Sequence, residues 1–190
     1  MEPLDEVRFL TNHSTGQLGS SLADALIKSG HETTLLLSES ARNLPNSTKV
    51  NIHPFNSTNS LKTEIKNLSN GNISAVFHVA AVSDFTPKAS VKGKINSSKN
   101  VSISLNPTPK IINQLREWYP TALLFGWKYD VEGDQDSLIK RGFEQITRCR
   151  TDYCVLNGSA YGTGFGLLQR ELVHCPSQRD LIRSLLTSLQ

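Results

Sequence analysis

The fold is decided by the stretch Ala75-Val76-Phe77-His78-Val79-Ala80-Ala81-Val82-Ser83-Asp84, in which an apolar run passes into small residues and then a carboxylate. This pattern predicts a short buried strand at residues 75–80. Open α/β sheets bind ligands just beyond the carboxyl ends of such strands, so Asp84 is a candidate to accept hydrogen bonds from a ribose. Two other interpretations stay open: Asp84 caps the loop backbone, and His78 is a core residue whose polar atoms are satisfied.

Apolar runs alternate with helical patterns on both sides of this stretch. Further strands are expected at residues 33–37, 50–54, 101–105, 122–125, 152–156 and 171–174. Apolar residues at three- and four-residue spacing predict helices at residues 16–29, 60–69, 109–118, 136–148 and 178–189, the last with Ser177 as its N-cap. This order predicts the α/β class, with a three-layer Rossmann-like fold in which helices cover both faces of a mostly parallel sheet. Because no repeat or linker divides the chain, one domain is expected over residues 1–190.

The start of the chain lacks one element of this pattern. A doubly wound sheet normally begins with a strand that leads into the first phosphate-binding turn. Here residues 2–12 lead directly into the first predicted helix. The first strand of the sheet is therefore expected to be missing.

Composition and charge argue against several classes of protein. Of the 190 residues, 37% are hydrophobic and 19% are charged, and the formal net charge is +3. The basic residues are scattered, which argues against a nucleic-acid partner. No apolar stretch is long enough to span a membrane and no signal-peptide pattern opens the chain, so we expect no membrane partner and a cytoplasmic location. Cys149, Cys154 and Cys175 lack metal-binding spacing, and no metal site is predicted.

The first predicted helix is preceded by Asn12-His13-Ser14-Thr15-Gly16-Gln17-Leu18-Gly19. Small residues leave backbone N–H groups free at a helix start, where the helix dipole favours an anion, so a phosphate or carboxylate site is one interpretation. The other is an ordinary N-cap by Ser14 or Thr15. Because Gly16 and Gly19 are its only glycines, the segment is not the GxGxxG fingerprint of dinucleotide-binding proteins.

Two polar loops follow predicted strands. Residues 81–100 carry Lys88, Lys92, Lys94 and Lys99, which form either a cationic lid over phosphates or a solvated loop. Residues 157–166 are rich in glycine and form a second loop at the same edge of the sheet. The sequence shows no order of Ser, His and Asp typical of a catalytic triad and no pair of catalytic carboxylates. Binding and transfer of phosphate groups is therefore favoured over hydrolysis by a side-chain nucleophile.

Several of these segments, in this order, resemble those of phosphopantothenate-cysteine ligases. The resemblance rests first on Glu2-Pro3-Leu4-Asp5-Glu6-Val7-Arg8-Phe9-Leu10-Thr11-Asn12-His13-Ser14-Thr15-Gly16 and on Ala80-Ala81-Val82-Ser83-Asp84-Phe85, followed by Lys94. It continues through Asn106-Pro107-Thr108-Pro109-Lys110-Ile111, Phe125-Gly126-Trp127 and residues 152–166. Each piece alone is weak, whereas their joint occurrence in order covers nearly the whole chain.

The resemblance implies a ligase of coenzyme A biosynthesis. Such an enzyme activates the carboxylate of 4'-phosphopantothenate with CTP or ATP, accompanied by Mg2+, and cysteine then displaces the nucleotide. It further implies a homodimer, because family sites are completed across a two-fold interface, and it leaves open whether a separate flavin-dependent decarboxylase is a partner. The residues suit this chemistry, because an acyl-nucleotide needs cations and amide donors near its phosphates and no protein nucleophile.

The same resemblance implies roles for individual residues. Asn12 matches the asparagine that holds the acyl-nucleotide, Arg8 matches an arginine beside it, and Lys94 matches the lysine of the activation step, so these three are the expected catalytic residues. Asp84 matches the ribose contact, and Trp127 lies where the family commonly has Phe against the base. The expected nucleotide-binding residues are His78, Val79, Ala80, Asp84, Lys94, Thr108, Pro109, Lys110, Ile111 and Trp127. The expected residues for the substrate phosphate are Ser14, Thr15 and Gly16.

The chain also departs from the family in ways that bear on activity. The family has two further lysines after Lys94-Ile95, where this chain has Asn96 and Ser97, and it has helix lysines where this chain has Gln145 and Cys149. An alternative hypothesis is therefore a diverged or inactive relative that binds a nucleotide or phosphorylated metabolite without ligating it. A conventional NAD-dependent oxidoreductase is a third candidate, which the lack of GxGxxG disfavours.

Overall fold

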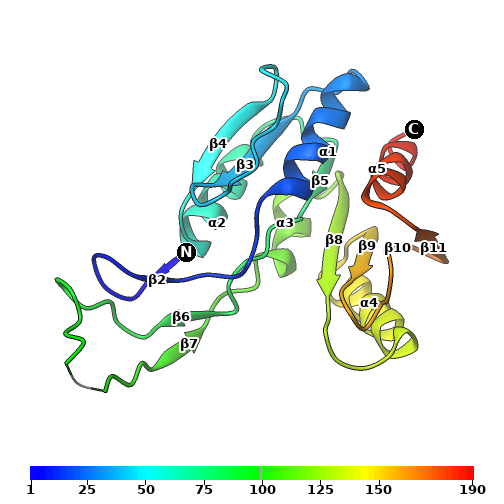
Figure 1. Cartoon of the computed structure of the whole chain (residues 1–190). Helices are drawn as coiled ribbons and strands as arrows, with labels where there is room; N and C mark the ends of the chain where they lie inside the picture. Colours follow the sequence, from blue (N-terminus) through cyan, green and yellow to red (C-terminus); the bar gives the residue numbers. More distant parts are fainter. Residues whose placement is uncertain (99) are drawn as a thin grey trace.

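The main sheet of the computed structural model has five strands in the order β11-β10-β9-β8-β5 (Figure 1). The structure describes residues 1–98 and 100–190, so Lys99 lies outside the described residues. β5, β8 and β9 run parallel to one another. β10 pairs antiparallel with β9, and β11 pairs antiparallel with β10 at the edge of the sheet. The predicted α/β fold, built on a parallel sheet, is confirmed. The strands are β5 (Ala75–Phe77), β8 (Leu123–Tyr129), β9 (Tyr153–Asn157), β10 (Phe165–Leu168) and β11 (Leu172–Cys175).

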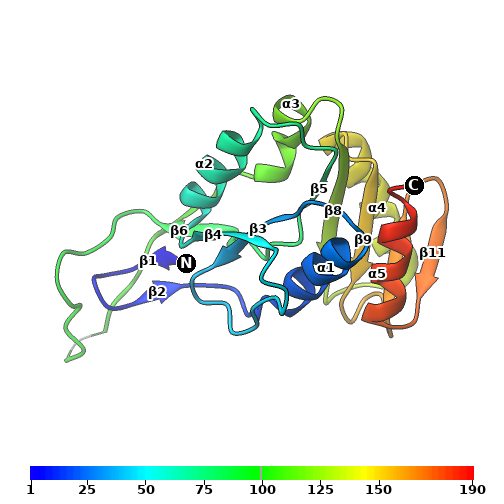
Figure 2. The ribbon, with the colours of Figure 1, turned by 90° about the horizontal axis from the view of Figure 1, so that it is seen from above.

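Helices cover both faces of this sheet, as the three-layer prediction requires (Figure 2). On one face, α1 (Gln17–Lys28) and α5 (Gln178–Thr187) pack their leucines against Phe125 and Val155. On the other face, α2 (Thr58–Leu68) and α3 (Leu115–Trp118) pack against Leu124, and α4 (Gln135–Cys149) packs against Leu156. β8 and β9 thus bury side chains on both faces, which explains the apolar runs in their sequences.

Side-chain caps account for the starts of α2, α4 and α5. The Ser177 hydroxyl accepts a hydrogen bond from the backbone N–H of Asp180, which confirms Ser177 as the N-cap of α5. α2 begins before its predicted start at residue 60, because Ser57 and Ser60 form a reciprocal capping box.

The helix predicted at residues 109–118 is in fact two short pieces, the 3-10 helix η1 (Ile111–Asn113) and α3. Lys110 keeps an extended conformation, so helical geometry begins only at Ile111. The tight turn buries both Ile111 and Leu115 against the sheet. The apolar spacing in residues 109–118 therefore indicates that these two side chains are buried, and it does not indicate the length of the helix.

The parallel region is divided into two sheets. β3 (Thr34–Ser38) pairs in parallel with β4 (Asn51–Phe55), and no described strand joins this pair to the main sheet. Leu36 of β3 and Val76 of β5 nevertheless pack into one apolar cluster with Leu61 of α2. The doubly wound strand order places the first strand between the second and the fourth, which here means between β3 and β5. The division therefore lies where the sequence predicts a missing strand.

An arm of short strands extends from the body (Figures 1 and 2). β1 (Glu2–Pro3) pairs antiparallel with β2 (Phe9–Leu10), and β6 (Phe85–Pro87) pairs antiparallel with β7 (Leu105–Pro107). The strand predicted at residues 101–105 is wrong, because residues 101–104 have no regular structure and Leu105 begins β7 of the arm. Val101, Ile103 and Leu105 are exposed, so their alternation lies on the surface and not in the core.

Two further sequence expectations concern the cysteines and the membrane. Cys149, Cys154 and Cys175 are free and buried, as ordinary core thiols. Among the described residues, no helix combines the length and the apolar character needed to cross a bilayer.

Candidate functional site

The candidate site lies in the segment that follows the carboxyl end of β5. The backbone N–H of Thr108 donates to the carbonyl of Asp84 at 2.9 Å, and the Thr108 hydroxyl donates to the carbonyl of Ser83. Lys110 forms an ion pair with the Asp84 carboxylate. The structure thus brings together Asp84, Thr108 and Lys110, which were expected to bind nucleotide. The side chains of Asp84 and Lys110 are 66% and 55% exposed, so a ligand can reach both.

Asn12 reaches the same segment from the start of the chain. Its side-chain amide nitrogen donates to the carbonyl of Val82 at 3.0 Å and to that of Ala81 at 3.3 Å. The side chain itself is exposed. Asn12 therefore ties the approach to α1 to the loop that carries Asp84.

The start of α1 corrects one interpretation of the sequence. The N-cap is Gly16, with φ 77° and no capping side chain, so the assignment of Ser14 or Thr15 as N-cap is wrong. The left-handed backbone favours glycine, and a Cβ on Gly16 would lie 3.0 Å from the Cβ of Ala41. The carbonyl of Thr15 accepts hydrogen bonds from the backbone N–H groups of Arg42 and Asn43 and from the side-chain amide of Asn43. The backbone before α1 is therefore joined to the loop that follows β3.

The first turn of α1 keeps donors for a ligand. The backbone N–H groups of Leu18 and Gly19 have no hydrogen-bond acceptor within residues 1–98 and 100–190. Both lie at the positive end of the helix dipole. The geometry is therefore compatible with an anion beside Ser14, Thr15 and Gly16, which stays a prediction.

The strand end at His78 is suited to lining a site and not to acid–base chemistry. Burial lowers the pKa of His78 to about 4, so its imidazole is neutral at physiological pH. Its backbone N–H donates to the carbonyl of Phe125 at 2.9 Å and extends the β5–β8 ladder. Val79 and Ala80 follow as half-buried residues.

Trp127 and Ile111 are not brought into contact. Trp127 packs into the cluster beneath α1 and α5, whereas Ile111 is buried in the cluster on the opposite face of the sheet. The indole N–H of Trp127 is buried and has no hydrogen-bond partner among the described residues. Since an unpaired buried donor costs free energy, a ligand acceptor that reached it would stabilise the structure. Pro109, beside Lys110, is exposed.

The lysine-bearing loop is joined to the arm and not to the Asp84 cluster. The Arg8 guanidinium donates to the carbonyl of Ile95 at 3.2 Å, next to Lys94. The side chains of Lys88, Lys92 and Lys94 are exposed. In the part of the chain that the structure describes, no hydrogen bond or ion pair links Lys94 to Asn12 or Asp84. The lid interpretation of these lysines therefore stays a prediction.

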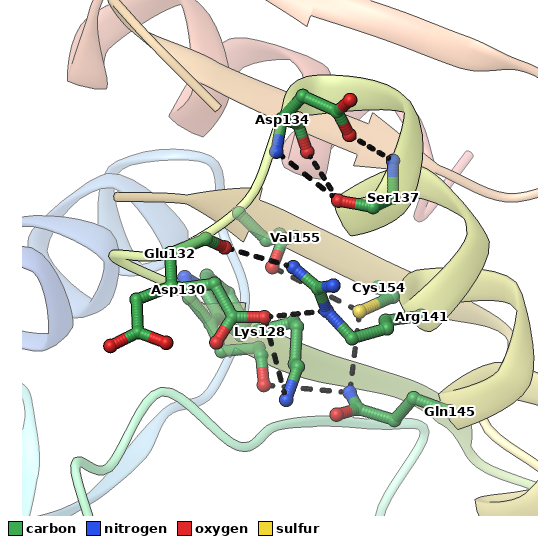
Figure 3. A network of polar contacts seen from close by, with 10 residues as sticks. Lys128, Asp130, Glu132, Asp134, Ser137, Arg141, Gln145, Cys154 and Val155 are labelled. Carbon is green, nitrogen blue, oxygen red and sulfur yellow. Dashed lines mark hydrogen bonds and ion pairs between the residues drawn. The ribbon is translucent and has the colours of Figure 1, made fainter. Parts of the chain in front are cut away.

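A polar network at the carboxyl end of β8 was not anticipated from the sequence (Figure 3). The Asp130 carboxylate accepts from Arg141 Nε at 2.8 Å and lies 3.8 Å from Lys128 Nζ. Gly158 lies directly beside it, where a Cβ would come within 2.2 Å of the Asp130 carbonyl. The glycine-rich loop is therefore anchored to this network. The one feature of the sequence that could have indicated this network is the mixture of charged residues after the predicted strand at residues 122–125.

Two departures from the ligase pattern lie in the interior. Gln145 is buried, and its amide nitrogen donates to the carbonyl of Trp127 at 3.4 Å and to the sulfur of Cys154 at 3.2 Å. The Cys149 thiol donates to the side-chain oxygen of Asn113 at 3.1 Å. Neutral side chains suit these positions, because a lysine there would lose hydration.

Comparison with known proteins assigns a family. The profile of the DNA/pantothenate metabolism flavoprotein C-terminal domain family matches residues 1–183. The chain belongs to this family. A curated relative, the coenzyme A biosynthesis bifunctional protein CoaBC of Thermococcus kodakarensis, is 31% identical over 156 residues, which make up 82% of this chain and 38% of the relative. The chain therefore spans less than half the length of that relative.

Solved structures agree with this family assignment. The DNA/pantothenate metabolism flavoprotein from Streptococcus pneumoniae superposes with a TM-score of 0.87 at 25% identity, over 100% of this chain and 93% of that one. A Cab2 mutant in complex with phosphopantothenate-cysteine gives a TM-score of 0.81 at 19% identity, over 99% of this chain and 82% of that one. At that identity, the second likeness shows the shared fold alone.

Proposed function

We propose that this chain is a ligase domain that joins 4'-phosphopantothenate and cysteine in coenzyme A biosynthesis. The observation that carries the proposal is the cluster after β5, where Asn12 is bonded to the loop backbone and Asp84 is joined to Thr108 and Lys110. Membership of the family supports it. So does the phosphopantothenate-cysteine bound to the Cab2 protein of the same fold.

The proposed reaction has two steps. A carboxylate oxygen of phosphopantothenate attacks the α-phosphate of CTP or ATP, and pyrophosphate leaves. The amine of cysteine then attacks the acyl carbon, and the nucleoside monophosphate leaves. Negative charge develops on the oxygens of the departing pyrophosphate, which Lys94 stabilises, while the N–H groups at the start of α1 hold the phosphate of phosphopantothenate. Asp84 accepts from the ribose after its ion pair with Lys110 opens.

The proposal includes further components. Mg2+ enters with the triphosphate, whose phosphate oxygens are ligands that this ion prefers. A separate flavin-dependent decarboxylase supplies the second activity of the pathway, and both act in the cytoplasm.

A turnover assay tests the reaction directly. We expect the chain, incubated with 4'-phosphopantothenate, cysteine, Mg2+ and either CTP or ATP, to release pyrophosphate, with no release when phosphopantothenate is omitted. Absence of pyrophosphate with both nucleotides would contradict the proposal. Calorimetric binding of nucleotide without turnover would instead support the alternative, a diverged relative that binds without ligating.

We also propose that the chain forms a homodimer through its arm. Large apolar side chains are exposed along the arm and its loop, and several exposed apolar side chains in one part of a protein are typical of an interface. A second copy of the chain is the occupant that the resemblance implies. The exposed side chains are Val7, Phe9, Phe85, Val91, Val101, Ile103 and Leu105.

Charges placed on this surface should separate the two copies. We expect the double substitution Phe9→Asp and Ile103→Asp to weaken the dimer more than about 100-fold, because unpaired carboxylates would be buried in the interface. Light scattering across a concentration series measures the change. Phe143→Asp is the matched control, since Phe143 is 40% exposed on α4, away from the arm. A monomeric parent, or a dimer that survives the double substitution, would show that the arm is not the interface.

A further inference from the structure

Asp5 is a fully buried carboxylate in the arm. Its side chain is 0% exposed, in the turn between β1 and β2. One carboxylate oxygen accepts from the backbone N–H groups of Val7 at 2.8 Å and Arg8 at 2.7 Å. The other accepts from the backbone N–H of Ile95 at 3.0 Å and from the Arg8 guanidinium at 3.1 Å. Four donors thus converge on one side chain.

These contacts fix the backbone on both sides of Lys94. Both polar backbone groups of Ile95 are held, the N–H by Asp5 and the carbonyl by Arg8. The carbonyl of Gly93 accepts from the backbone N–H of Glu6 at 3.2 Å. Lys94 therefore projects from a segment whose two neighbouring residues are tied to the turn that Asp5 organises.

Charge explains why a carboxylate is needed here. The hydrogen bond from the Ile95 N–H, with those from Val7 and Arg8, holds the pKa of Asp5 below its usual value. The group is therefore ionised at neutral pH and acts purely as an acceptor. A neutral amide in its place would direct its own N–H groups at two of the four donors, because each carboxylate oxygen accepts from two of them.

We propose that Asp5 is a positioning residue for the ligase reaction: by fixing Ile95 and the Arg8 guanidinium, it sets where the ammonium group of Lys94 meets the triphosphate. This role rests on the proposed function and on the role of Lys94 within it. Nucleotide binding through Asp84, Thr108 and Lys110 does not depend on Asp5, because no hydrogen bond or ion pair of the described residues connects Asp5 to that cluster.

The test substitution is Asp5→Asn, which keeps the shape and removes the charge. We expect acyl-nucleotide formation in a single turnover to slow about 100-fold, since a displacement of about 1 Å at a reacting group has an effect of that size. The dissociation constant of the nucleotide should change far less than this rate, because Asp84, Thr108 and Lys110 keep their contacts. Amide hydrogen exchange at Ile95 should accelerate, while exchange in α5 should not change.

A double-mutant cycle separates positioning from general support of the fold. If Asp5 acts through Lys94, then Asp5→Asn should add nothing to the defect of Lys94→Gln. Glu6→Gln is the matched control, because Glu6 is an exposed carboxylate in the same turn and should leave every rate unchanged. Asp5 lies outside the three apolar clusters of the body, so the variant is expected to keep its far-UV circular dichroism.

The outcomes are distinct. Loss of activity that disappears in the Lys94→Gln background, together with faster exchange at Ile95, supports the proposal. Effects of the two substitutions that multiply, or an Asp5→Asn protein as fast as the parent, would overturn it. An inactive parent would instead contradict the ligase function itself, and that failure appears before any variant is made.

Discussion

Lys94→Gln is expected to slow formation of the acyl-nucleotide by about 30- to 1000-fold, which corresponds to about 2 to 4 kcal/mol of transition-state stabilisation. The lysine would neutralise charge on the triphosphate as pyrophosphate departs, so its loss is felt mainly in the first transition state. Asn96 and Ser97 are uncharged, so neither of these two residues offers a replacement cation. The measurement is single-turnover chemistry with labelled phosphopantothenate, in which the acyl-nucleotide and the final product are quantified separately.

Lys92→Gln is the matched control for this experiment. Lys92 lies on the same loop and is likewise exposed, and it undergoes the same change of charge. A defect confined to Lys94→Gln would assign a specific role to that lysine. If Lys94→Gln forms the intermediate at the parent rate, the lid assignment is wrong, and the lysines belong to a solvated loop.

The sequence was sufficient for the elements that are buried on both faces. β5, β8 and β9 lie between two helical layers, so their apolar runs are continuous and easily detected. β8 extends beyond its predicted end at residue 125, because Gly126 and Lys128 interrupt the apolar run while the ladder to β9 continues. The predicted end of β8 is therefore wrong, because strand pairing continues beyond the residues whose side chains are buried.

The arm was not predictable in the same way. Its strands are two or three residues long, too short to show a period. Asp5 is an ordinary acidic residue in the sequence, and its burial depends on Ile95, which lies 90 positions away. Joining Asn12 to Val82 likewise needs a contact across 70 positions. Such long-range hydrogen bonds leave no local pattern, and the resemblance to the family, which assigned a role to Asn12, assigned none to Asp5.

The division between β3 and β5 shows what general topology contributes. The doubly wound order predicts an interruption between β3 and β5 without any structural information. That the two sheets stay aligned has a separate cause, since Leu36 and Val76 share a cluster with Leu61 of α2. Packing against the helical layer thus keeps the β3–β4 sheet beside the main sheet, although no strand hydrogen bonds join the two sheets among the described residues.

Asn12→Asp is expected to act at the second stage of the reaction. The amide nitrogen of Asn12 donates to the carbonyls of Val82 and Ala81, and a carboxylate has no N–H to replace either bond. The substitution also adds negative charge beside the anionic acyl-nucleotide. Two lost hydrogen bonds and the repulsion together are worth about 2 to 4 kcal/mol, so conversion of the intermediate should slow by about 30- to 1000-fold.

Asn43→Asp separates this role from simple loss of structure. The Asn43 amide donates to the carbonyl of Thr15 at 3.1 Å, so the control removes the same kind of bond near the start of α1 while leaving the Asp84 loop intact. We expect Asn12→Asp to accumulate acyl-nucleotide, and Asn43→Asp to process it at close to the parent rate. Equal defects in both variants would mean that Asn12 only secures the backbone. Failure of Asn12→Asp to form any intermediate would place Asn12 in the activation step with Lys94, because a residue that acts after pyrophosphate has left cannot prevent its release.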